Sequence, residues 1–128
     1  MEIKLLSQDK EKVRVIVKGT SPAEMNAYRR ILLTLVPAMA IDTVEFLDNS
    51  SALYDEMLAH RLGLVVLKTD VESYFMRKDC KCKGEGCARC TLDLTLEAEG
   101  PGIVYAEQIK SKDPAVVPVF GKTPLVKL

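Results

Sequence analysis

The sequence predicts an α+β fold with two helices and about seven strands, and two kinds of pattern carry this prediction. Apolar residues alternate with polar ones over residues 2–18 and again over 91–99, as half-buried strands require. Apolar residues recur at helical spacing over residues 22–35 and 52–62. A chain of 128 residues can form one ordinary domain or two small ones around a hydrophobic core.

The N-terminal part of the chain predicts a β-hairpin followed by a capped helix. Two alternating runs within residues 2–18 flank a polar, turn-like stretch at residues 7–11. Ser21 can cap the helix, Pro22 suits its first turn, and Glu24 can complete a capping box. The apolar residues of this helix are expected to form a buried stripe of Tyr28, Ile31, Leu32 and Leu35.

A strand, a helix and a second strand are expected next. Residues 40–46 alternate as a strand does, and residues 48–51 read as a turn and helix cap. The helix is expected over residues 52–62, with Gly63 as the residue that follows its end. The apolar run at 64–67 suits a strand that is buried on both faces.

The C-terminal part predicts further short strands. Residues 91–99 show the most regular alternation in the chain, and residues 103–105 are expected to pair back after a glycine-rich turn. Prolines restrict residues 116–119 and 125–128 to short or edge strands.

Four cysteines have the spacing of a metal chelate, C-x-C-x4-C-x2-C, on a polar loop over residues 76–90. They are Cys80, Cys82, Cys87 and Cys90. Four thiolates favour a structural zinc ion, with an iron–sulfur cluster, and hence a redox module, as the alternative. Two disulfides or four free thiols are the other interpretations, and the absence of a secretory signal at the start makes them less favoured.

Composition argues against several other functions. The formal net charge is zero, and there is no Trp, which disfavours a nucleic-acid-binding zinc module. His60 is the only histidine, and it could hydrogen-bond Glu56 four residues before it. A catalytic role would also need a nucleophile and a pocket, and the sequence indicates neither, so a helix with one packed or interface histidine is preferred. Arg29 and Arg30 flank the apolar stripe, which is typical of a protein–protein contact, although two solvated charges are the simpler interpretation.

Longer stretches of the chain resemble a known family, the α-type subunits of cellular RNA polymerases. The most similar branch is the archaeal D subunit with its eukaryotic third-subunit relatives. The stretches that carry the resemblance are Asn-Ala-Tyr-Arg-Arg-Ile-Leu-Leu at 26–33, residues 36–41, Asp-Asn-Ser-Ser-Ala-Leu-Tyr-Asp-Glu-Met-Leu-Ala-His-Arg-Leu-Gly-Leu at 48–64, and residues 97–101, 109–114 and 116–119. Two departures are Tyr28, where the family usually has Leu or Ile, and Val66, where Pro is common.

The resemblance implies a two-lobed fold. Residues 1–48 would be the first half of a dimerisation lobe, and residues 49–128 an inserted β-rich lobe that carries the cysteine loop, which binds zinc in some relatives. Family chains continue beyond the position of Leu128 to complete the dimerisation lobe. We therefore expect that lobe to be incomplete here, as in a natural split subunit or a truncated chain.

The resemblance also implies a non-catalytic, cytoplasmic assembly subunit of DNA-directed RNA polymerase. The chain would form a heterodimer with subunit L and support the large subunits together with small subunits N and P. A separate C-terminal half of the D subunit is a further expected partner. Arg29 and Arg30 would contact the second-largest subunit, with Asn26 and Ile31 on the same interface.

Overall fold

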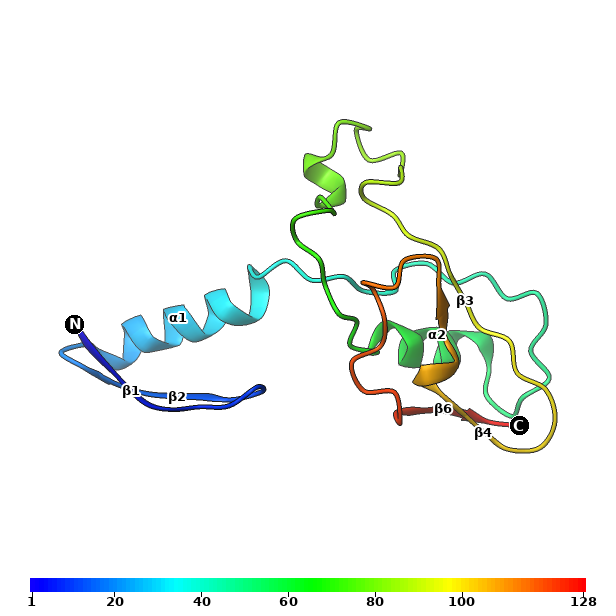
Figure 1. Ribbon diagram of the computed structural model, residues 1–128, viewed down its shortest axis with the longest axis horizontal. Helices are drawn as coiled ribbons and strands as arrows, with labels where there is room; N and C mark the ends of the chain where they lie inside the picture. Colours follow the sequence, from blue (N-terminus) through cyan, green and yellow to red (C-terminus); the bar gives the residue numbers. More distant parts are fainter. The chain divides into compact units, whose positions relative to one another are not determined.

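The computed structural model describes all 128 residues, which form two compact units, Met1–Val36 and Pro37–Leu128. Figure 1 traces the elements of each unit along the chain. The mixed α and β composition predicted from the sequence is confirmed, with two α-helices and six short strands in three two-stranded sheets. No helix combines the length and the apolar character needed to cross a membrane.

The first unit begins with the predicted β-hairpin. Strands β1 (Glu2–Gln8) and β2 (Val13–Lys18) pair antiparallel, with Ile3 opposite Val17. A bulge at Leu6 shifts the register within β1. The alternating pattern therefore predicted this element correctly, because a hairpin needs only partners that are close in sequence.

Helix α1 (Pro22–Thr34) begins where the capping box predicts. The Ser21 hydroxyl accepts the N–H of Glu24 at 3.3 Å, and the Glu24 carboxylate accepts the N–H of Ser21 at 2.9 Å. The predicted burial of its apolar stripe is wrong, because the helix has no buried residue. A hairpin and one helix are too small to bury this face. The helical pattern therefore predicted which residues share a face, but not whether another element covers it.

The core of the second unit lies where helix α2 (Asp55–Gly63) packs against the sheet of β4 (Ile103–Tyr105) and β6 (Pro124–Lys127). Leu125 and Val116 are the largest fully buried side chains. The complete core consists of Leu58, Leu62, Val65, Leu67, Val104, Ala106, Ile109, Val116, Leu125 and Val126.

A second small sheet joins β3 (Leu94–Thr95) to β5 (Lys110–Ser111), antiparallel. The long strand predicted over 91–99 is therefore reduced to two residues. Its alternation is nevertheless kept, because Leu92, Leu94 and Leu96 pack against the core while the residues between them are exposed. Two short 3-10 helices complete the secondary structure, η1 (Arg77–Asp79) and η2 (Ala106–Gln108).

The strand predicted over residues 40–46 is wrong. Ile41, Val44 and Phe46 do pack against the core. No strand of the protein pairs with this segment, however, so it keeps the side-chain pattern of a strand without the hydrogen-bond ladder.

The strand predicted over residues 64–67 is also wrong. Only Leu67 forms a bridge, to Pro118. Val65 and Leu67 are buried, whereas Leu64 and Val66 are exposed, so this apolar run has one buried face rather than two.

Helix α2 begins later than predicted, because local side-chain hydrogen bonds hold the residues before it. Asn49 Oδ1 accepts the hydroxyl of Ser51 at 2.6 Å, and Asn49 Nδ2 donates to the carbonyl of Leu53 at 3.0 Å. Such bonds compete with a first helical turn. Gly63 is the last helical residue rather than the one that follows the helix.

Candidate metal centre

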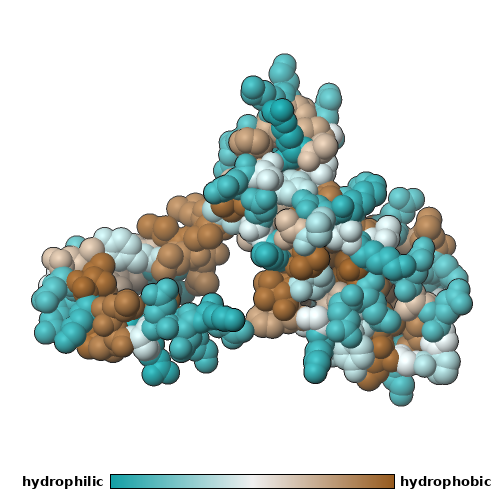
Figure 2. Space-filling model, viewed as in Figure 1, coloured by the Kyte–Doolittle hydropathy of each residue, from teal (hydrophilic) through white to brown (hydrophobic).

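The cysteine loop, residues 76–90, is closed at its base by a hydrogen bond from the N–H of Phe75 to the carbonyl of Arg89, 2.9 Å. Beside this base, the N–H of Cys90 donates to the carbonyl of Cys87 at 2.9 Å, which forms the tight turn of the C-x2-C pair. Hydrophilic side chains project from this loop (Figure 2), so backbone hydrogen bonds rather than apolar packing define its shape.

The four residues between Cys82 and Cys87 reverse the direction of the chain. Lys83, Gly84 and Gly86 have φ angles of 54°, 90° and 92°. Glycine adopts this left-handed region without the steric cost of a Cβ atom. The reversal brings the second cysteine pair to face the first.

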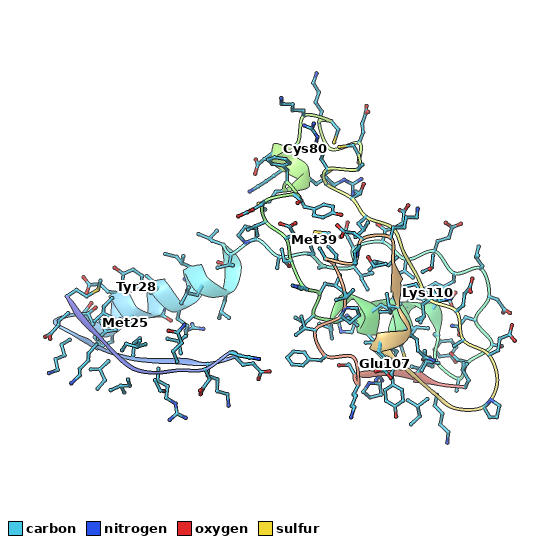
Figure 3. The ribbon with its side chains drawn as sticks, viewed as in Figure 1. Met25, Tyr28, Met39, Cys80, Glu107 and Lys110 are labelled. Carbon is cyan, nitrogen blue, oxygen red and sulfur yellow. The ribbon has the colours of Figure 1, made fainter.

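The four sulfur atoms lie within 4.8 Å of one another. Cys80 and Cys87 are 3.6 Å apart at Sγ, Cys82 and Cys90 are also 3.6 Å apart, and no disulfide joins them. A tetrahedral ion with Zn–S bonds of about 2.3 Å requires sulfur separations of about 3.8 Å. The donor set therefore fits one tetrahedral metal ion, and the predicted grouping of the cysteines can bind a metal. Figure 3 marks the position of Cys80 in this loop.

Two of the thiols have strongly shifted pKa values. The backbone N–H groups of Gly86 and Gly84 point at the Cys82 sulfur and lower its pKa to about 6. The N–H of Cys87, 3.3 Å from the Cys90 sulfur, acts to lower the pKa of Cys90, but burial and the neighbouring thiols outweigh it and raise that pKa to about 11. Backbone N–H donors therefore favour the thiolate form of Cys82, whereas burial and the neighbouring thiols favour the protonated form of Cys90.

Two residues that the sequence did not single out anchor this loop. Tyr74 hydrogen-bonds Asp113, and Arg77 hydrogen-bonds the carbonyl of Gly84. The partners are 39 and 7 residues apart in the chain. Neither contact is part of a repeating helix or strand pattern, so no periodic signal in the sequence could have indicated it.

The predicted interface residues lie on α1 of the first unit. Asn26 Oδ1 accepts Arg29 Nη2 at 2.8 Å, which holds the Arg29 guanidinium along the helix. The side chain of Arg30 makes no ion pair, and Ile31 is exposed. Figure 2 shows apolar side chains gathered over the C-terminal part of this helix and over the hairpin.

The carboxylates near His60 do not form a catalytic group. Asp55 accepts a hydrogen bond from Asn49 Nδ2 at 2.6 Å and so fixes the loop before α2. His60 is exposed, and no hydrogen bond joins it to Glu56. His60 is therefore not packed, and its place at an interface stays a prediction.

Comparison with known proteins places the chain among components of RNA polymerases. Residues 39–128 match the family described as the RNA polymerase Rpb3/RpoA insert domain. The chain is 41% identical over 127 residues to DNA-directed RNA polymerase subunit Rpo3 of Archaeoglobus fulgidus, covering 99% of this chain and 48% of the relative. It is 42% identical over 129 residues to Rpo3 of Methanosarcina acetivorans, covering 100% and 48%. It is 43% identical over 128 residues to Rpo3 of Pyrococcus horikoshii, covering 100% and 47%. The chain thus spans about half the length of the curated relatives it matches.

Proposed function

Because the chain belongs to the RNA polymerase Rpb3/RpoA insert-domain family, we propose that it serves as a non-catalytic assembly subunit, or part of one, in an archaeal DNA-directed RNA polymerase. One observation carries the proposal: relatives named Rpo3 are 41–43% identical to it along almost its whole length.

The proposed partners are the other polymerase subunits. Residues 1–48 would contribute to a dimerisation lobe that pairs with subunit L, and residues 49–128 would form the inserted lobe. The second-largest subunit and small subunits N and P would assemble on this platform in the cytoplasm, together with any separately encoded C-terminal half of the D subunit.

Exposed apolar surface on the first unit supports a partner-dependent role. Every residue of β1 is exposed, and α1 has no buried residue. A group of apolar side chains that is exposed in this way typically marks an interface with another molecule. The exposed apolar group comprises Ile3, Leu5, Leu6, Val13, Val15, Ile31, Leu32, Leu33 and Leu35.

The proposed contact with the second-largest subunit centres on Arg29 and Arg30, with Asn26 and Ile31 beside them. Arginine beside apolar surface is a frequent source of binding energy at protein interfaces. The hydrogen bond from Arg29 to Asn26 supports this role, because a side chain that is already ordered loses less entropy on binding.

Zinc is the proposed metal, held by Cys80, Cys82, Cys87 and Cys90. The distances between the sulfur atoms fit a tetrahedral zinc ion, and four protein ligands leave no coordination position for a reacting water. When bound, the ion supplies four metal–thiolate bonds that close a loop without an apolar core. No observation favours the iron–sulfur redox alternative as a function, and metal analysis of the purified chain would decide between the two.

Purification of the tagged chain from its native cell, followed by mass measurement of every associated protein, tests the assembly role. We expect the large polymerase subunits and a small dimerisation partner to be recovered with it. Recovery of the chain alone, or only with proteins unrelated to transcription, would overturn the proposal.

A further inference from the structure

The cysteine loop lacks the packing that normally holds a metal-binding segment in shape. None of residues 76–90 belongs to the hydrophobic core, and Cys80 is the only one of them that is buried. Three residues between the cysteine pairs also hold left-handed backbone conformations. Backbone hydrogen bonds restrict this segment, and a side-chain contact can restrict it further before an ion arrives, which lowers the conformational entropy that is lost on binding.

One side chain supplies such a contact. Arg77 Nε donates to the carbonyl oxygen of Gly84 at 3.0 Å. Its Nη2 lies 3.6 Å from the position that a Cβ on Gly86 would occupy, so the guanidinium lies near the side of that glycine where a side chain would project. A third nitrogen, Nη1, lies 3.8 Å from Asp42 Oδ2. Arg77 thus hydrogen-bonds one glycine of the turn between the cysteine pairs, lies near the other, and faces the carboxylate of Asp42.

The chemistry of arginine suits this position. A guanidinium is planar and presents several N–H groups in fixed directions, so one side chain can donate to a carbonyl and face a carboxylate at once. Its permanent positive charge also offsets the net charge of −2 that four thiolates and a divalent zinc ion carry together. Lysine carries the charge without the fixed geometry.

We infer that Arg77 is a positioning residue of the metal centre, which holds the turn at Gly84 and Gly86 in the shape that brings the two cysteine pairs together. This inference rests on the proposed binding of a metal by the four cysteines. The hydrogen bond to Gly84 carries most of the effect, because the Asp42 contact is long and both of its side chains are exposed.

Cobalt(II) titration of the full 128-residue chain tests the inference, since tetrathiolate cobalt has a visible absorption spectrum. The variants are Arg77→Gln, Arg77→Lys and, as a control matched in charge, Arg89→Gln, whose side chain makes no hydrogen bond or ion pair. Arg77→Gln should weaken cobalt binding about tenfold, the lower end of the range for residues that orient metal ligands. The cobalt affinity of Arg77→Lys should lie between those of Arg77→Gln and the wild type. The cobalt affinity of Arg89→Gln should equal that of the wild type.

All variants should reach the same spectrum at saturation, because the four ligands are unchanged. Equal affinities for Arg77→Gln and Arg89→Gln would overturn the role of Arg77 while leaving the metal site intact. Failure of the wild-type chain to form the tetrathiolate spectrum would overturn the metal site and the role of Arg77 together. If circular dichroism shows that Arg77→Gln is unfolded, Arg77→Lys is compared with Arg89→Lys instead. Weaker cobalt binding by Arg77→Lys supports the role of Arg77, and equal affinities overturn it.

Discussion

Tyr74 and Asp113 are joined across 39 residues by a 2.7 Å hydrogen bond from the tyrosine hydroxyl to Oδ2 of the carboxylate. The other carboxylate oxygen of Asp113 accepts the N–H of Ala115 at 2.8 Å, which fixes the turn after β5. Tyr74 thereby attaches the base of the cysteine loop to the body of the second unit. The hydrogen bond to Asp113, followed by burial, raises the pKa of Tyr74 above its ordinary value of 10.0.

Tyr74→Phe should lower the thermal midpoint slightly at pH 8 and flatten the alkaline part of the stability profile. A tyrosine with a raised pKa contributes stability that is fully present below its unfolded value, near pH 10, and lost as the pH rises through the folded value. Thermal melts from pH 8 to pH 11 measure this. Tyr54→Phe is the control, because that side chain is exposed. Parallel profiles for Tyr74→Phe and wild type would contradict the prediction.

Leu125→Ala should destabilise the chain by about 3 kcal/mol, because removing a buried leucine leaves a cavity in the core. Leu125 is 1% exposed, at the contact between β6 and α2. Leu47→Ala is the matched control, since that leucine of the same unit is 94% exposed and its loss should cost about 0.5 kcal/mol or less. Urea unfolding followed by circular dichroism gives both values. If the two variants lost similar amounts of unfolding free energy, Leu125 would not be a core residue.

The sequence predicted those features whose partners are near in the chain. The capping box of Ser21 and Glu24 and the grouping of the cysteines each depend on contacts within about ten residues. The strand predicted over 40–46 failed for a physical reason: alternation reports which face is buried but not whether a hydrogen-bond partner exists. Tyr74 was missed because its acceptor on Asp113 is 39 residues away, and Arg77 was missed because a polar side chain gives no periodic signal of its acceptor even when that acceptor is only 7 residues away.

Glu24→Gln should remove the acid sensitivity of α1 while leaving the helix intact at pH 7. The hydrogen bond from the backbone N–H of Ser21, and then that from the hydroxyl of Thr20, lower the pKa of Glu24. Its stabilising effect is therefore complete above pH 4.5 and is lost as the pH falls through the lowered value. Glutamine can accept the same bonds but does not titrate.

Amide chemical shifts of α1, recorded from pH 7 to pH 3, measure this effect. The wild-type helix should fray at its first turn in acid, and the Glu24→Gln helix should not. Glu45→Gln serves as the control, because Glu45 makes no hydrogen bond or ion pair in the second unit. An acid transition of equal size in wild type and Glu24→Gln would show that the capping box does not control the start of the helix.

Cys82→Ser should abolish stoichiometric zinc binding and loosen the cysteine loop without unfolding the second unit. Serine is a poor ligand for zinc, and the core of the unit includes no residue of the loop. Zinc content by mass spectrometry and amide spectra of residues 76–90 measure the two effects. Ala88→Ser adds a hydroxyl to the same loop without removing a ligand and should retain the ion. Global unfolding of Cys82→Ser would show that the loop contributes to the core after all.

Replacement of Arg29 and Arg30 by Ala should leave α1 folded but weaken capture of the second-largest polymerase subunit about tenfold, the effect of losing about 1.4 kcal/mol at an interface. The Arg29 side chain bonds only to Asn26 on the same helix, and that of Arg30 makes no ion pair, so neither holds the fold together. Pull-down with the reconstituted subunits measures capture, and circular dichroism measures helix content. Arg14→Ala removes the same kind of side chain from β2 of the same unit, away from the helix, and should capture normally. Equal capture by all variants would move the interface away from this helix, because two arginines beside an exposed apolar face would then contribute nothing to binding.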